Sequence, residues 1–125
     1  DYKEAFRWFK AAAEQGDAYA QYRLGNCYEN GEGVKQDYKE AFRWFKAAAE
    51  QGDADAQCSL GNCYENGKGV KKDYKEAYYW YLISYLNGYI AAEPNIYLIE
   101  KILTDQQKQE VQNRVNEWFR THPEE

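Results

Sequence analysis

Apolar residues recur at the spacing of an amphipathic helix in the segment 37–51. They stand at positions i, i+3, i+4, i+7, i+10 and i+11, which share one helix face: Tyr38, Ala41, Phe42, Phe45, Ala48 and Ala49. Asp37 suits the N-cap, and Glu40 three residues later matches a capping box. Gly52 suits the left-handed position after the last turn. The pattern predicts a helix over 37–51, named helix B, and another over its copy at 1–15.

A second helix is predicted from Asp53 to about Asn66, with an earlier copy beginning at Asp17. A mid-helix glycine, Gly25 or Gly61, costs each copy about 1 kcal/mol relative to alanine. A close crossing with a neighbouring helix accounts for such a glycine. One face of the earlier copy carries Ala20, Gln21, Leu24, Gly25 and Tyr28. We name this element helix A; a glycine-containing turn follows it and leads into the next helix B.

The chain repeats this pair of helices. Residues 37–72 match residues 1–36 at 31 of 36 positions, and a third copy begins at Asp73 and departs after Ala77. Self-similarity at such a period is typical of repeat arrays, in which each unit buries its apolar face against its neighbours. The sequence therefore predicts an all-α solenoid of helix-turn-helix repeats over residues 1–86, starting at helix B of a truncated repeat.

Residues 87–125 depart from the repeat and are expected to form C-terminal capping helices. Asn87 and Gly88 end the third helix B, and Pro94 begins a short helix to about Leu103. Thr104, with a glutamine three residues later, caps a longer helix. One face of that helix is apolar: Val111, Val115, Trp118 and Phe119. Residues 121–125 are expected to fray.

Composition narrows the classes of partner. The net charge of −5 is spread over mixed positions without a basic stripe, which argues against nucleic acid and anionic lipid. No stretch reaches the roughly 18 apolar residues that a membrane span needs. The first residues do not form a signal peptide, although a signal could have been lost if the chain is a fragment. Localisation therefore stays open.

No catalytic or cofactor pattern is present in the sequence. The single histidine is His122, and HExxH, GxSxG and Walker patterns are absent. Gly31-Glu32-Gly33 stands between two helices and is interpreted as a turn. Asp53-Ala54-Asp55 lacks the glycine and glutamate that a calcium loop requires. We therefore expect no enzyme, no metal and no cofactor.

The three cysteines are expected to be reduced and to pack as small hydrophobic residues. Cys58 and Cys63 lie five positions apart on one predicted helix, so their side chains diverge. Cys27 and Cys63 are equivalent positions of successive repeats, which we expect to exceed the roughly 7 Å Cα separation that a disulfide can bridge.

The fixed positions of the repeat resemble the Sel1-like repeat, a relative of the tetratricopeptide repeat. One copy of the pattern is Ala20, Leu24-Gly25, Tyr28, Gly31, Gly33-Val34, Asp37, Ala41, Trp44, Ala48-Ala49 and Gly52; the next is Ala56, Leu60-Gly61, Tyr64, Gly67, Gly69-Val70, Asp73, Ala77 and Trp80. The resemblance covers about residues 1–86.

The resemblance implies antiparallel helix pairs stacked into a right-handed alpha-alpha superhelix, with helix A lining the concave side. It also implies an adaptor or scaffold role in protein complexes, often in bacteria, and places Trp44 and Trp80 in the core. Some Sel1-like proteins carry a disulfide in every repeat, and the cysteines of this chain do not reproduce that regular pairing.

The two copies differ at five positions, three of them on helix A: Tyr19/Asp55, Tyr22/Cys58 and Arg23/Ser59, besides Glu32/Lys68 and Gln36/Lys72 in the turn. The three share the face opposite Leu24. Tyrosine and arginine often anchor interfaces. We predict that this surface, named the helix A face, binds a protein or peptide through Tyr19, Tyr22, Arg23, Asn26, Asn30, Asp55, Ser59 and Asn62.

Other interpretations remain beside a binding scaffold. Drift at exposed positions explains the same differences, and an engineered or purely structural array explains the near-perfect repetition. A weak cell-wall or β-lactam-directed enzyme, suggested for some Sel1-like relatives, is a further alternative. Ser59 or another hydroxyl in a closed pocket beside a base would favour the enzyme, and an open groove would favour the scaffold.

The first helix B has no preceding helix A to cover its apolar stripe, which contains Tyr2, Ala5, Phe6, Trp8 and Phe9. Leaving two or three of these rings exposed forgoes several kcal/mol at about 25 cal/mol per Å². We therefore expect either a longer chain upstream or self-association through Tyr2, Phe6 and Phe9.

Overall fold

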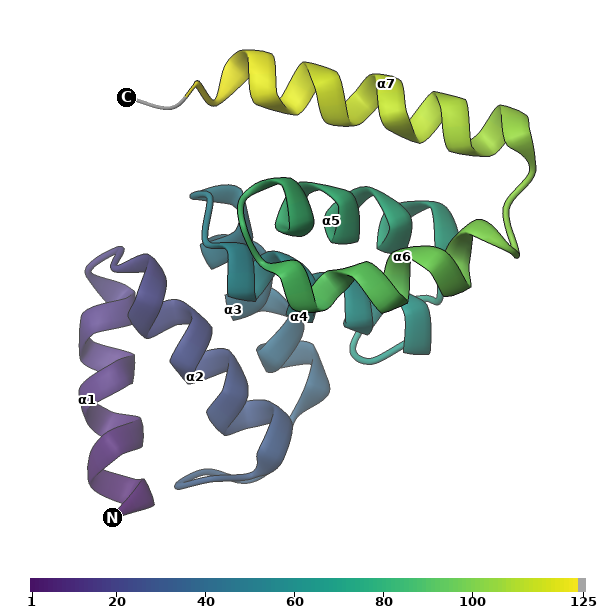
Figure 1. Ribbon diagram of the computed structural model, residues 1–125. Coiled ribbons are helices and arrows are strands. Elements are labelled where there is room, and N and C mark those ends of the chain that lie inside the picture. Colours follow the sequence, from purple (N-terminus) through teal and green to yellow (C-terminus); the bar gives the residue numbers. More distant parts are fainter. Residues whose placement is uncertain (124–125) are drawn as a thin grey trace.

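The structure is a computed structural model that describes residues 1–123, all of them in helices or short connections. Its elements are α1 (Tyr2–Glu14), α2 (Ala18–Asn30), α3 (Tyr38–Glu50), α4 (Ala54–Asn66), α5 (Tyr74–Leu86), the 3-10 helix η1 (Ile90–Ala92), α6 (Glu93–Glu100) and α7 (Asp105–Thr121). Figure 1 shows the helices stacked from α1 at one end to α5, with α7 lying across the other end. The predicted all-α architecture is confirmed, with α1, α3 and α5 as helices B and α2 and α4 as helices A.

An aspartate begins each of the five repeat helices. Its carboxylate accepts hydrogen bonds from backbone N–H groups of the first turn, which otherwise lack partners: Asp1, Asp17, Asp37, Asp53 and Asp73. The capping box expected at α3 is only half formed. Glu40 pairs with Arg43 at 3.2 Å instead of returning to the cap, whereas Thr104 and Gln107 form the complete box at α7.

The mid-helix glycines mark close helix crossings, as predicted. A Cβ on Gly25 would lie 2.6 Å from the Phe45 ring, and a Cβ on Gly61 would lie 2.7 Å from the Tyr81 ring. Each helix A therefore brings its backbone against an aromatic ring of the next helix B. The resulting core is continuous from α3 to α7, and Phe45 and Tyr81 are fully buried in it.

A buried glutamine on each helix A joins it to helices on both sides. Gln57 Nε2 donates to the Ala49 carbonyl at 3.1 Å, and its Oε1 accepts from Asn87 at 3.0 Å. Gln21 makes the matching bonds to Ala13 and Gln51 in the first copy. These bonds add a second partner to the Ala13 and Ala49 carbonyls, which also accept from the backbone N–H groups of Gly16 and Gly52.

Helix α6 continues the register of helix A. The buried residues Ala92 of η1 and Ile96 and Ile99 of α6 stand 36 positions after Ala56, Leu60 and Cys63, which are buried on α4. The sequence prediction placed this helix at Pro94 and did not include η1. Tyr97 stands where α2 and α4 have glycine, and 57% of it is exposed. A following helix B therefore cannot approach α6 as α5 approaches α4.

Helix α7 packs on α5 and closes this end of the array. Val111, Val115 and Trp118 are buried along its inner face. Arg114 pairs with Glu76 at 2.6 Å, and Lys75 pairs with Glu110 at 3.1 Å. The expected fraying is wrong for Thr121, which belongs to α7, and for His122, which stacks on Trp118; residues 124–125 of that prediction lie outside the described part of the chain.

Candidate functional site

The helix A face begins with a linked pair at its N-terminal end. Arg23 Nη1 donates to the hydroxyl of Tyr19 at 2.9 Å, and the Arg23 guanidinium lies 5.1 Å from the centre of the Phe9 ring. Tyr19 is 55% exposed and Arg23 is exposed as well. The pair therefore offers a phenol and a cation to solvent while it covers part of α1.

The remaining predicted residues differ in their exposure. Asn30 and Asp55 are exposed, whereas Asn26, Ser59 and Asn62 are half-buried. Tyr22 is also half-buried, with its ring 6.1 Å from that of Phe45. Tyr22 thus contributes to packing between α2 and α3, which the comparison of the copies did not reveal.

The turn residue Lys68 adds to this face at its second copy. Its ammonium donates to Asn62 Oδ1 at 3.4 Å and lies 3.9 Å from a carboxylate oxygen of Glu29. The equivalent position in the first copy is Glu32, which could not pair with a glutamate. The ion pair between Lys68 and Glu29 therefore depends on one of the five differences between the copies.

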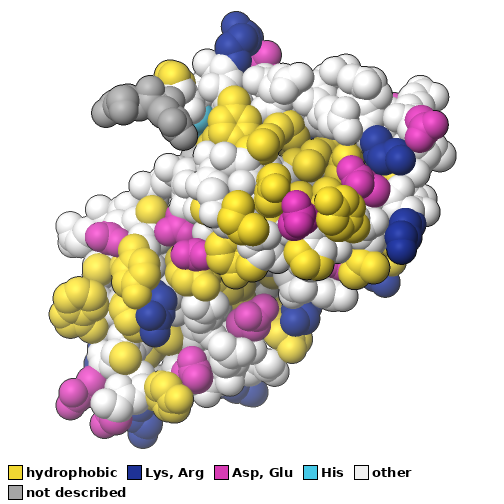
Figure 2. Space-filling model, viewed as in Figure 1, with side chains coloured by type: hydrophobic (Ala, Val, Ile, Leu, Met, Phe, Trp, Pro, Cys, Tyr) yellow, Lys and Arg dark blue, Asp and Glu magenta, His cyan; other side chains and the backbone are white. Residues whose placement is uncertain are grey.

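Helix α6 extends the same face with apolar side chains. Leu98 and Ile102 stand 36 positions after Asn62 and Asn66, and they are 56% and 52% exposed. Figure 2 shows hydrophobic side chains gathered over the region of α5 and α6, with positive and negative groups interspersed elsewhere. The 36-residue register, which assigns Ala92 and Ile96 to the core, also assigns Leu98 and Ile102 to this face, so the sequence could have predicted their position.

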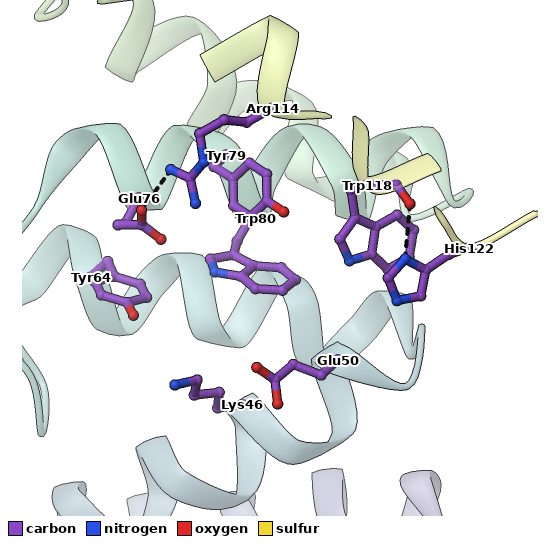
Figure 3. Close-up of a pocket in the computed structure, with 9 residues that line it drawn as sticks. All are labelled: Lys46, Glu50, Tyr64, Glu76, Tyr79, Trp80, Arg114, Trp118 and His122. Atoms are coloured by element: carbon purple, nitrogen blue, oxygen red, sulfur yellow. Dashed lines mark hydrogen bonds and ion pairs between the residues drawn. The ribbon is translucent and has the colours of Figure 1, made fainter. Parts of the chain in front are cut away.

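A cavity of about 470 Å³ lies between α3, α5 and α7, with Tyr64 of α4 also in its wall. Figure 3 shows its lining: Lys46, Glu50, Tyr64, Glu76, Tyr79, Trp80, Arg114, Trp118 and His122. None of these residues was predicted as a site. Trp44 and Trp80 were both predicted to lie in the core; Trp80 does and is 7% exposed, whereas Trp44 is only half-buried. The serine that would have favoured an enzyme, Ser59, does not line this cavity.

Two polar arrangements shape the wall that α7 contributes. The Arg114 guanidinium lies 4.1 Å from the centre of the Tyr79 ring while it pairs with Glu76. His122 lies parallel to Trp118 with the ring centres 4.0 Å apart, and its Nδ1 lies 2.8 Å from the Trp118 carbonyl oxygen. Because the carbonyl can only accept, Nδ1 donates and Nε2 stays available to a ligand.

The three cysteines are free thiols. Burial is the main cause that raises the pKa of Cys58 to about 11 and that of Cys63 to about 12, and it raises the pKa of Cys27 as well. These side chains therefore stay protonated at neutral pH. Residues 1–123 contain no cluster of three His, Cys, Asp or Glu side chains able to hold a metal ion. Over the same range, each helix is too short or too polar to cross a membrane.

The stacked helix pairs, glycine crossings and closing helix define an α-solenoid repeat protein. The Sel1 repeat model matches residues 1–17, 18–53 and 54–89, so the chain belongs to the Sel1 repeat family. The resemblance in the repeat pattern is thereby confirmed. Each full match consists of one helix A and the following helix B, the pair that Gly25 or Gly61 joins.

Solved structures show the same fold. The chain is similar to a protective antigen of uropathogenic Escherichia coli strains with an SLR (Sel1-like repeat) fold, at 37% identity over 94% of this chain and a TM-score of 0.90. It is also similar to a Sel1 repeat protein from Oxalobacter formigenes, at 46% identity over 78% of this chain and a TM-score of 0.75. The chain spans only 26% and 40% of the lengths of these two proteins. Among curated proteins, none matches this chain.

Proposed function

We propose that this chain is a protein- or peptide-binding scaffold whose recognition surface is the helix A face. Sel1 repeat proteins generally serve as scaffolds for protein interactions. The observation that carries the proposal is the contrast between two identical helices and two variable ones. Helices α1 and α3 have the same sequence, whereas α2 and α4 differ at three positions, all exposed or half-buried.

The face changes character along the array. Tyr19 and Arg23 offer a phenol and a cation at one end, Asp55 offers a carboxylate in the middle, and Leu98 offers an apolar side chain at the other end. A peptide that carries an acidic residue near Arg23 and an apolar residue near Leu98 would match this order. Arginine and tyrosine are also the residue types that most often dominate binding energy.

A random-peptide library selected on the wild-type chain tests the proposal. Selected peptides are then measured by calorimetry against a Tyr19→Ala/Arg23→Ala variant. We expect affinity to fall at least about tenfold if both residues are hot spots. Tyr22 is unsuitable for this test because it packs on Phe45, so that its removal would also disturb the fold.

Arg43→Ala is the matched control, because Arg43 is an exposed arginine on helix α3 that lies outside the helix A face. Its affinity for the selected peptides should equal that of the wild type. Peptides that bind the double variant as tightly as the wild type would place recognition elsewhere on the molecule.

Self-association through α1 is a second candidate, favoured by the exposure of its aromatic rings. Trp8 is 70% exposed and Tyr2 is 64% exposed, whereas Phe6 and Phe9 are half-buried. Phe6 packs edge-on against Tyr28 at 5.5 Å. The outer rings therefore offer an apolar surface that a second copy could cover in a closed two-fold pairing.

Light scattering over a range of concentrations tests this pairing. A Tyr2→Glu/Trp8→Glu variant removes exposed rings and leaves the contact of Phe6 with Tyr28 in place, so it should dissociate the dimer without unfolding it. Wild-type chain that stays monomeric at high concentration would reject this candidate.

A further inference from the structure

We propose that the cavity between α3, α5 and α7 binds the C-terminal arginine of a peptide. The guanidinium would lie against Trp80 and Glu50, and the α-carboxylate would meet Lys46. The site is separate from the helix A face, because none of its lining residues belongs to that face.

The chain already places guanidinium groups on aromatic rings of its B helices. The Arg43 guanidinium lies 5.0 Å from the centre of the Trp44 ring, and that of Arg114 lies 4.1 Å from the centre of the Tyr79 ring. Such contacts are attractive because the face of an aromatic ring carries negative electrostatic potential. With Arg23 on Phe9 of α1, the geometry that the proposal requires therefore occurs three times on the B helices of the fold.

Trp80 is the corresponding tryptophan without a cation. It stands 36 positions after Trp44, but Tyr79 replaces the arginine that precedes Trp44. Over residues 1–123 no arginine or lysine lies over the Trp80 ring. Tyr79 packs edge-on against Trp80, with the ring centres 5.0 Å apart, so a ligand cannot lie there. The ring also lines the cavity, and Figure 3 shows Glu50 and Lys46 on the side away from Tyr79, where a guanidinium from a ligand would meet the open part of the ring.

Glu50 supplies the opposite charge for that cation. Arg114 and Glu76 neutralise each other across the upper wall of the cavity. Glu50 has no ion-pair partner among the described residues. Figure 3 shows its carboxylate below the Trp80 ring, between Lys46 and the stacked pair of Trp118 and His122. A cation there would gain both an aromatic face and a carboxylate.

Lys46 adds a positive charge beside Glu50, so a complementary ligand also carries a negative charge. It precedes Glu50 by four residues on α3, so the ammonium and the carboxylate occupy neighbouring positions on one helix face. Lys46 would repel a ligand that is only cationic, and Glu50 would repel one that is only anionic. A C-terminal arginine presents both charges within one residue, in the order that complements this pair.

The cavity has the size and the donors for such a ligand. Its volume is about 470 Å³, and ligand sites usually have volumes of about 300–1,000 Å³. His122 Nε2 faces away from the bond that fixes the ring, and it can contact the peptide backbone.

The test is a nuclear magnetic resonance titration with the peptide acetyl-Gly-Gly-Arg, observed at the indole N–H signals of the four tryptophans. The signals of Trp80 and Trp118 should shift, and those of Trp8 and Trp44 should stay in place. The same peptide ending in citrulline, which keeps the shape of arginine without its charge, should bind at least about tenfold more weakly. Equal binding of the citrulline peptide, or shifts confined to Trp8 and Trp44, would overturn the proposal.

The repeat provides matched control variants. Glu50→Gln should weaken binding about tenfold, whereas Glu14→Gln changes the same residue of α1, outside the cavity, and should have no effect. Lys46→Gln should weaken binding of the peptide with a free C-terminal carboxylate. It should leave binding of the same peptide with a C-terminal amide unchanged, and Lys10→Gln is the matched control. All four residues are exposed, so the variants keep the fold. Equal effects within either matched pair would refute the site.

Discussion

Helices α1 and α3 have the same thirteen-residue sequence and different surroundings. Phe45 of α3 is fully buried against Gly25 of α2, whereas Phe9 of α1 is half-buried under the guanidinium of Arg23. Trp8 is 70% exposed and its counterpart Trp44 is half-buried. The hydrophobic pattern of a helix in this array therefore indicates which face can be buried. The extent of burial depends on the neighbouring helix.

The largest expected effect comes from removing the same ring at the two positions. Phe45→Ala should lower the free energy of unfolding by about 3–5 kcal/mol, because it leaves a cavity in the core. Phe9→Ala should cost no more than about 2 kcal/mol, because much of that ring is already in contact with water. Urea unfolding measures both values. Equal losses would contradict the difference in surroundings.

A smaller loss is expected where the helices touch. Gly61→Ala gains about 1 kcal/mol of helix propensity, but its Cβ would lie 2.7 Å from the Tyr81 ring. Displacing a fully buried ring should outweigh that gain and lower stability by about 1–3 kcal/mol. A variant that melts at a higher temperature than the wild type would show that the crossing can relax.

The buried glutamines extend the comparison to the A helices. Gln57→Ala removes the side-chain bond to the Ala49 carbonyl, which keeps only its backbone partner Gly52, and the bond from the Asn87 amide, and it should cost about 1–2 kcal/mol. Gln21 is 7% exposed while Gln57 is fully buried, so Gln21→Ala should cost less. Urea unfolding of the two variants ranks them, and the reverse order would contradict the role of burial.

The smallest expected effect is the pH dependence of the thiols. Burial raises the pKa of Cys63 from 9.0 to about 12, so the unfolded chain loses this proton first as the pH rises. The stabilising contribution is fully present below pH 9 and is lost between pH 9 and 12. Urea unfolding on both sides of pH 9 should show a smaller decline for Cys63→Ala than for the wild type. An unchanged decline would assign the pH dependence to other groups.

Local signals in the sequence predicted much of the fold. Aspartates cap the helices and glycines allow the close crossings, and the same contacts recur in each repeat. An assignment made in one copy could therefore be checked against the next copy. Glu40 is an exception, because the nearby Arg43 competes for its carboxylate. The division into an array over 1–86 and a cap over 87–125 stays a proposal. Helix α6 continues the register of helix A beyond residue 86, so the position of this boundary depends on whether α6 is counted as a repeat helix.

The cavity could not be predicted in the same way. It brings Glu50 of α3 together with Trp118 of α7, residues far apart in the sequence whose approach depends on the path of the last helix. The apolar face of α7 predicted packing on the last repeat, but not the position along α5 at which the helix lies. The helix A face as a binding surface stays a prediction, and the sequence did not reveal the packing of Tyr22 on Phe45.

Tyr97 has a consequence for how an array of this kind changes length. A 36-residue unit inserted after Gln36 would meet the same partner surfaces on both sides, because α1 and α3 are identical and both A helices carry the crossing glycine. A unit added after α6 would meet a tyrosine ring where the incoming helix needs bare backbone. Duplication can therefore lengthen this array between α2 and α3, whereas a repeat added after α6 would lose the close helix crossing.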